Sequence, residues 1–147
     1  PDQPLPTMLP NSPVPPQAFT LTIDSLRRRT RVDFYGLLTV EDMLEAARAL
    51  LRHPDYSPGY EHIWVLLGVT LLSIDPCEMG CLTRKMTNWI ADGRMQAAPL
   101  VVVVARPELV GVAHLYKHIM ARNAAQPVEV FGTIHEAEQW LDQEVQA

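Results

Sequence analysis

The segment Pro99–Ala105 reads PLVVVVA and offers no polar side chain to either face of a strand. A strand with two apolar faces is buried on both sides, which is typical of a parallel sheet covered by helices. A second apolar run, Ile63–Val69, has the same character. Because helical periodicity flanks these runs, the sequence predicts an α/β fold with a parallel sheet at its centre.

Length and composition favour one domain and exclude several classes of function. The chain has 147 residues, of which 48% are hydrophobic, and a net charge of −5. This is enough apolar material for one core, and the negative charge disfavours nucleic acid as a partner. The longest apolar run, Ile63–Ile74, is shorter than the roughly 20 residues of a membrane helix, so no transmembrane segment is expected. Cys77 and Cys81 lie too close for a fold-spanning disulfide, which favours a reducing, cytoplasmic location.

The first sixteen residues differ from the rest in composition. Pro1–Pro16 contains seven prolines, which block both helical and ladder hydrogen bonds. We expect a flexible tail there; the alternative is that this segment is itself a proline-rich ligand for the aromatic groove of a partner. The α/β domain is expected over residues 17–147. Since the chain starts without Met, it is interpreted as a processed or trimmed product.

The domain opens with alternating patterns that predict two paired strands. Phe19–Ile23 and Arg31–Tyr35 alternate apolar and polar residues, and Gly36 is expected to end the second strand. Arg27–Arg29 lies between them and is interpreted as a solvated edge, with an anion site as the lesser possibility.

Strands and helices then alternate to the C-terminus. Helix starts are predicted at Thr39, at Asp75 with Glu78, at Pro107, and at Thr133 with Glu136. A last strand is expected at 128–131. The prediction is a single α/β domain with a five-stranded, mostly parallel mixed sheet and four helices, its first strand being antiparallel at or near an edge.

Several segments together resemble the bacterial SpoIIAA-like members of the STAS superfamily. They are Gly36–Asp42, the loop His53–Tyr56, and Val130 and Phe131 with Ala137, Trp140 and Leu141. The resemblance runs from about Phe19 to the C-terminus, so residues 17–147 are interpreted as a STAS-like domain. It implies a non-enzymatic module that binds regulatory proteins, nucleotides or lipids.

Some members of that superfamily are switched by serine phosphorylation after the third strand, in a loop of the Asp-Ser-Ser-Gly kind. Here the corresponding segment, Gly68–Asp75, reads GVTLLSID. Ser73 lies in it without the matching context.

Ligands of parallel sheets bind beyond the carboxyl ends of the strands. We therefore expect a binding region in the connection Thr70–Ile74 and at the end of the central strand. The predicted ligand-binding residues are Thr70, Leu71, Leu72, Ser73, Asp75 and Arg106. Two alternatives stay open: Leu71 and Leu72 close over the core, and Arg106 is a capping or surface residue rather than an anion ligand.

No catalytic motif, metal ligand set or cofactor is predicted. Cys77 and Cys81 lie on the polar face of their helix, near its N-terminus, where a thiol becomes more acidic. They are possible reactive thiols, or a small-residue face covered by a second subunit. Two cysteines do not complete a zinc site, and the spacing of His114 and His118 is interpreted as a solvated face.

The sequence favours a binding or regulatory module over an enzyme. Its expected partner is a regulatory protein or a small apolar or anionic ligand. A homodimer is favoured because Leu71 and Leu72 would otherwise expose apolar surface. The alternative is a small enzyme or thiol-dependent redox protein that uses the strand-end connection and Cys77.

Overall fold

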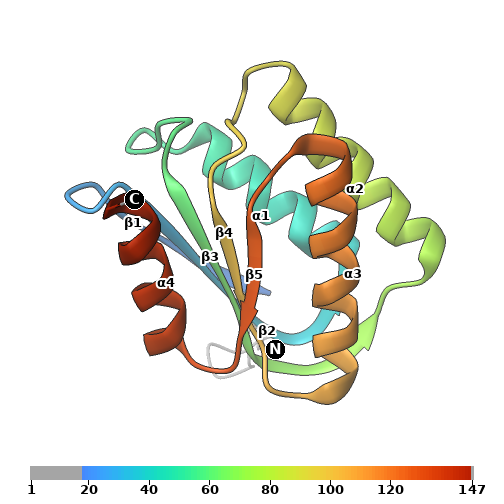
Figure 1. Ribbon diagram of the computed structural model, residues 1–147. Coiled ribbons are helices and arrows are strands. Elements are labelled where there is room, and N and C mark those ends of the chain that lie inside the picture. The colour runs from blue at the N-terminus through green and yellow to red at the C-terminus, as the bar shows by residue number, and fades with distance from the viewer. Residues whose placement is uncertain (1–17, 147) are drawn as a thin grey trace, which may run out of the picture.

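The computed structural model describes residues 18–146, with side chains as far as Gln143, and follows the predicted order of elements. The strands are β1 (Phe19–Asp24), β2 (Arg29–Thr39), β3 (Glu61–Ser73), β4 (Leu100–Val103) and β5 (Val128–Phe131). The helices are α1 (Val40–Arg52), α2 (Pro76–Ala91), α3 (Pro107–Ala124) and α4 (Ile134–Gln146) (Figure 1). The expected tail Pro1–Pro16 lies outside the described residues.

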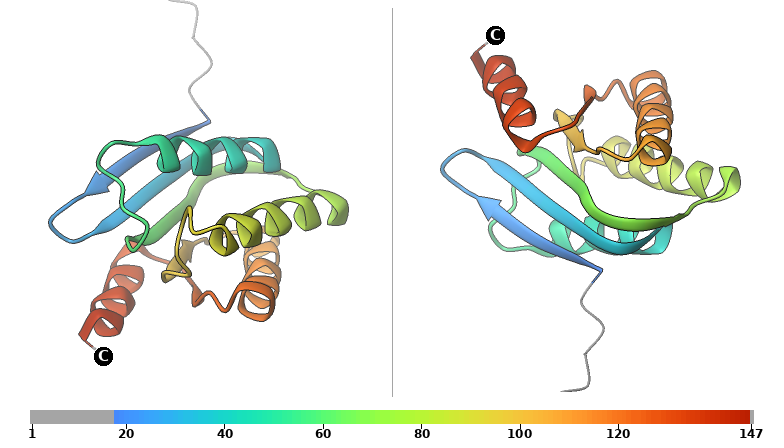
Figure 2. Two further views of the ribbon diagram at one scale, coloured as in Figure 1. Left: turned by 90° about the horizontal axis from the view of Figure 1, so that it is seen from above. Right: turned by 90° about the horizontal axis from the view of Figure 1, so that it is seen from below.

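The sheet has the strand order β1-β2-β3-β4-β5. β1 pairs antiparallel with β2, and the other three pairs are parallel. Each crossover moves one strand further in the same direction, and because crossovers are right-handed, α1, α2 and α3 cover one face. α4 lies on the other face, opposite α1 (Figure 2). The predicted α/β fold with a mostly parallel sheet is confirmed.

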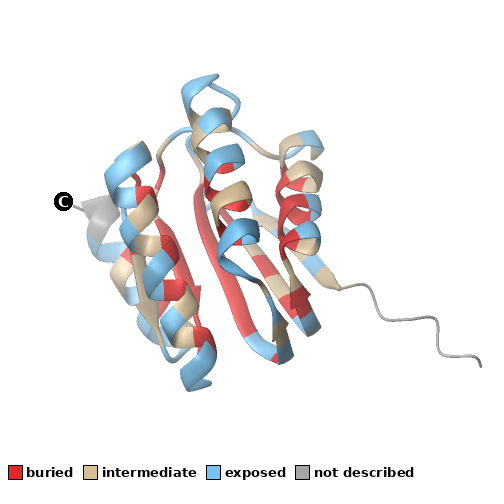
Figure 3. Ribbon diagram, turned by 90° about the vertical axis from the view of Figure 1, so that its right-hand side faces the viewer, coloured by how far each residue is buried: buried red, intermediate tan, exposed pale blue. Residues whose placement is uncertain are grey.

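Two apolar layers hold the sheet between its helices (Figure 3). On the larger face, the Trp64 ring lies 5.4 Å from that of Phe34 and 6.4 Å from that of Tyr116. On the other face, Ala137 and Leu141 of α4 are fully buried against β3 and β4. β4 is buried throughout, as its composition predicts, but it lies between β3 and β5, and β3 is the middle strand of the sheet.

Three predicted helix starts are confirmed in their capping geometry, and at α4 the Glu136 amide donates to Thr133 Oγ1 at 3.2 Å. The Asp42 amide donates to Thr39 Oγ1 at 3.1 Å, at the start of α1. At α2, the Glu78 amide donates to Asp75 Oδ1 at 2.7 Å and the Asp75 amide donates to Glu78 Oε1 at 2.9 Å. This reciprocal pair is the capping box that the sequence predicts.

The second and third strands are longer than expected, and this changes the candidate site. Gly36 does not end β2: its φ of +67° absorbs an irregularity in the ladder, and the strand continues to Thr39. The predicted connection Thr70–Ile74 is also wrong, because β3 runs to Ser73 and Leu71 pairs with Leu37. β4 stops pairing with β3 at Val65, so residues 35–39 and 66–73 form a two-stranded β2–β3 extension (Figure 1).

Arg29 departs from the solvated edge expected for Arg27–Arg29. Arg27 and Arg28 are exposed, but Arg29 is only 6% exposed. Its Nε donates to Glu61 Oε1 at 3.1 Å and its Nη2 to Asp142 Oδ1 at 3.0 Å. The register places Arg29 beside Glu61 at the starts of β2 and β3, and Asp142 of α4 reaches Arg29 from the helix above. Arg29 is buried because of tertiary packing, which the local run of three arginines does not predict.

Candidate functional site

A groove of about 270 Å³ lies between the end of β3 and the start of α3. Its lining consists of Val69, Thr70, Leu71, Leu72, Arg106, Glu108 and Leu109. Four of the six predicted ligand-binding residues therefore meet in one place: Thr70, Leu71, Leu72 and Arg106. Thr70 and Arg106 are 36 positions apart in the sequence, and they meet because β3 and the β4–α3 turn end at the same edge of the sheet.

Arg106 is the cation of this groove, and its hydrogen bonds are directed to the strand beside it. Its Nη1 donates to the carbonyl oxygen of Thr70 at 2.8 Å and, more weakly, to that of Val69 at 3.5 Å. Its Nε lies 3.5 Å from Glu108 Oε1. The guanidinium thus covers backbone carbonyls of β3 where β4 no longer reaches, and a carboxylate partly offsets its charge.

Ser73 and Asp75 do not line the groove. Ser73 is the last residue of β3 and pairs with Thr39. The Asp75 carboxylate is used as the cap of α2. Neither residue is therefore placed to contact a ligand that occupies the groove.

An exposed apolar surface lies on the face of the β2–β3 extension that points away from α1, α2 and α3. It comprises Tyr35, Leu37, Leu67 and Leu71, which are 40%, 46%, 46% and 64% exposed. We call these four residues the exposed sheet face. The described residues include six large exposed hydrophobic side chains, so two thirds of them gather here. Contiguous exposed apolar patches often mark interaction surfaces, whereas apolar side chains that are exposed singly are normal.

This surface is exposed because α4 covers only part of its side of the sheet. Ile63 and Val65 of β3 are buried beneath α4, and Leu67 follows them at the two-residue period of a strand. The three crossover helices all cover the opposite face, where Leu38, Leu66 and Val69 are buried. The described part of the chain therefore has no helix over the exposed sheet face.

Tyr35 is held in this surface by the absence of a side chain at Gly68. A Cβ atom built on Gly68 would stand 2.7 Å from Tyr35 Cδ1, so the ring lies directly against the glycine backbone. The Tyr35 hydroxyl is 3.4 Å from Thr20 Oγ1, which adds a weak polar contact to β1. Sequence reasoning missed Tyr35, Leu37 and Leu67, although period-two alternation continued past Ile63 would have found Leu67.

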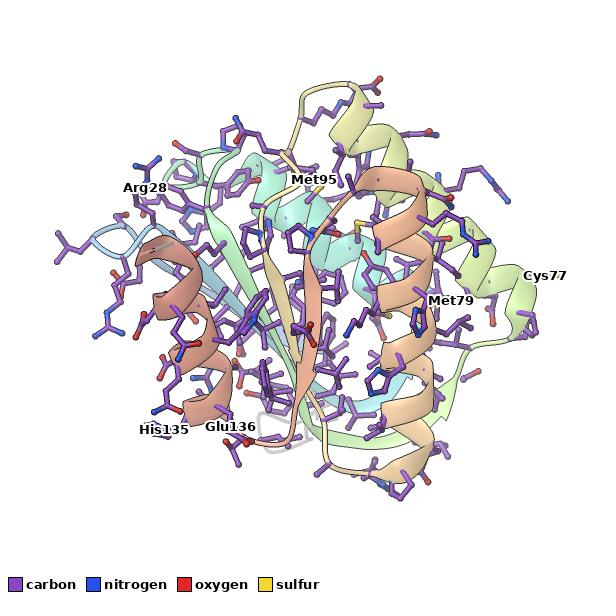
Figure 4. The ribbon with its side chains drawn as sticks, in the orientation of Figure 1. Arg28, Cys77, Met79, Met95, His135 and Glu136 are labelled. Carbon is purple, nitrogen blue, oxygen red and sulfur yellow. The ribbon has the colours of Figure 1, made fainter. Side chains whose placement is uncertain are left out.

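Cys77 and Cys81 lie on α2, as predicted, and both are free thiols. Cys77 is exposed at the outer end of the helix (Figure 4), and Cys81 is partly buried. Neither lines the groove beside Arg106. The structure thus does not bring the cysteines and the strand-end residues together.

A second groove, of about 500 Å³, runs along the β1–β2 hairpin. It is lined in part by Arg27, Arg29, Arg31 and Glu138. Arg31 is bound through two hydrogen bonds to Asp33, at 2.7 and 2.9 Å, and these carboxylate bonds raise its pKa. Because Asp24, Glu61 and Asp142 accompany the other guanidinium groups, the groove has no excess of positive charge for an anion.

No protein-family model matches this chain, and no curated protein or solved structure is significantly similar to it. None of the helices within residues 18–146 is long and apolar enough to cross a membrane. Within the same residues, no three His, Cys, Asp or Glu side chains are grouped so that they could hold a metal ion.

Proposed function

We propose that this chain is a non-enzymatic binding module that docks a second copy of itself through the exposed sheet face. The observation that carries the proposal is the clustering of Tyr35, Leu37, Leu67 and Leu71 on one uncovered face of the β2–β3 extension. A binding role agrees with the resemblance to SpoIIAA-like STAS domains. It also retains part of the predicted binding region, because Leu71 belongs to both the exposed sheet face and the groove.

The charges at the border of this surface favour a second copy over a strongly charged partner. Arg106 and Glu108 stand together beside Leu71 in the lining of the groove, so the border carries both signs of charge. A two-fold axis places each patch against its own copy, with apolar centres in contact. Arg106 of each copy can then face Glu108 of the other. A strongly basic partner would instead be repelled by Arg106, and a strongly acidic partner by Glu108.

The expected dimer is weak. Full burial of one large apolar side chain contributes roughly 1.5–3 kcal/mol. The four side chains are already about half buried, so the eight in a pair contribute roughly 6–12 kcal/mol. Association costs about 4–15 kcal/mol in lost freedom. These two free energies nearly cancel, so the net free energy of association is small. The fraction of dimer should therefore depend strongly on protein concentration.

Sedimentation equilibrium over a concentration series tests this proposal. We expect the wild-type protein to shift from monomer to dimer as its concentration reaches the high micromolar range. The double variant Leu37→Ser with Leu71→Ser should stay monomeric. Leu115→Ser is the matched control, because Leu115 is 48% exposed but lies on α3, and it should dimerise like the wild type.

Two results would overturn the proposal. One is a wild-type protein that stays monomeric at the highest concentration, which needs no variant to interpret. The other is equal loss of the dimer in the double variant and in Leu115→Ser. Circular dichroism melting of each variant shows whether its fold is retained.

A further inference from the structure

Two residues that each carry a buried polar atom without a partner line one small cavity at the opposite end of the sheet from the groove. The two atoms are His62 Nε2 on β3 and Gln126 Oε1 after α3, and both lack a hydrogen-bond partner among the described residues. The side chains themselves are 2% and 3% exposed. Buried polar atoms without partners are rare in native proteins, because each has lost its bond to water.

The hydrogen bonds of Thr30 favour the tautomer of His62 that carries its proton on Nδ1. Thr30 Oγ1 donates its one proton to the backbone carbonyl oxygen of Glu61 at 3.2 Å. Thr30 Oγ1 also lies 2.9 Å from His62 Nδ1, and the tautomer protonated on Nδ1 is the one that satisfies both contacts at once. Nε2 of the neutral ring is then left with a lone pair and can only accept.

The amide of Gln126 is oriented in a similar way. Its Nε2 donates to the carbonyl oxygen of Ala98 at 3.1 Å. Oε1 is consequently the atom that remains unpartnered, and it also can only accept. Both orphaned atoms therefore require a donor, and neither can satisfy the other.

The cavity that these residues line has a volume of about 20 Å³. A cavity needs at least about 10–15 Å³, measured in this way, to hold one water molecule. The rest of the lining is almost wholly apolar, and it includes Leu50, Met86 and Leu100. The cavity thus fits one small molecule that has two hydrogen-bond donors and needs few further polar contacts.

We propose that one buried water molecule occupies this cavity and donates one hydrogen bond to His62 Nε2 and one to Gln126 Oε1. An apolar occupant would leave both acceptors unpaired, and the volume excludes a larger donor. Through this water the start of β3 is tied to the end of α3 and, by the bond from Gln126 to Ala98, to the segment before β4. The site is independent of the proposed dimer surface.

Nuclear magnetic resonance of the full chain tests the proposal. In the wild type we expect cross-relaxation between a long-lived water and the His62 ring, with the ring protonated on Nδ1. Gln126→Met removes one acceptor and should abolish the water signal. Gln143→Met makes the same change at an exposed position of α4 and should preserve it.

A crystal structure of the wild type decides the matter even if Gln126→Met fails to fold. Density for one water within about 3.2 Å of both His62 Nε2 and Gln126 Oε1 is the expected result. A cavity without density, a water that reaches only one of these atoms, or a ring protonated on Nε2 would each overturn the proposal. A water signal that persists unchanged in Gln126→Met would do the same.

Discussion

His62 is a titratable side chain held neutral inside the protein. Burial lowers its pKa from 6.5 to about 4, because the charged ring would lose its hydration. The side chains that face it do not offset this cost: Thr30 is uncharged, Tyr56 and Tyr116 have raised pKa values, and Gln126 is neutral. The folded state therefore disfavours the proton that the unfolded chain accepts.

The free energy of unfolding should consequently depend on pH through His62. Between about pH 6.5 and pH 4 the unfolded chain binds a proton at His62 that the folded protein does not, so stability falls as the pH falls. The loss attributable to this residue is at most about 3 kcal/mol. Urea unfolding at a series of pH values measures it. His62→Phe should show a smaller slope over this range, and equal slopes in the two proteins would contradict the assignment.

At the scale of elements, the end of α3 carries a local strain that a substitution can relieve. Ala125 caps the helix with a φ of +52°, in the left-handed region where a Cβ atom is unfavourable. Its amide donates to the carbonyl oxygen of Met120. Glycine is the residue usually found at such a position.

Ala125→Gly should stabilise the protein by about 0.5–1 kcal/mol, since relief of the Cβ contact outweighs the added freedom of the unfolded chain. Ala121→Gly is the control, because it places the same change inside α3, where it should destabilise by a similar amount. Chemical denaturation of both variants measures the two effects. A loss of stability in Ala125→Gly as large as in Ala121→Gly would show that the left-handed cap carries no strain.

At the scale of the whole molecule, Arg29 links three elements that are distant in sequence. It pairs with Glu61 on β3 and with Asp142 on α4, which among the described residues is the one helix on its side of the sheet. The Arg29 and Glu61 side chains are only 6% and 9% exposed, whereas Asp142 is 57% exposed. The contact with Glu61 should therefore dominate the contribution of Arg29 to stability.

Arg29→Met should destabilise the protein by about 3–5 kcal/mol, because it removes the cation beside a buried carboxylate. Asp142→Asn should cost less than about 1 kcal/mol, since that pair is largely solvated. Adding Glu61→Leu to Arg29→Met should recover much of the loss by removing the buried charge as well. Equal losses in Arg29→Met and Asp142→Asn would contradict a buried ion pair as the main contact of Arg29.

The sequence by itself determined the architecture of this protein. The run Pro99–Ala105 predicts a strand that is buried on both faces, and the caps at Thr39 and Asp75 predict where helices begin. These signals are local: a strand with two apolar faces or a helix with a capping box reports its own environment within a few residues. The same reasoning placed Thr70–Leu72 and Arg106 at one edge of the sheet, because parallel strands end together.

Tertiary structure alone decided how far the strands extend, which surfaces stay open and which charges are buried. The apolar residues of Thr70–Ile74 leave both burial and exposure open, and the pairing of β2 with β3 makes Thr70–Ser73 part of a strand. Leu67 is exposed while Val65 is buried, because α4, which begins at Ile134, covers one and not the other. Arg29 is buried for the same reason, under residues more than a hundred positions away. A sequence pattern records the chemistry of a face, but whether that face is covered depends on packing by distant segments.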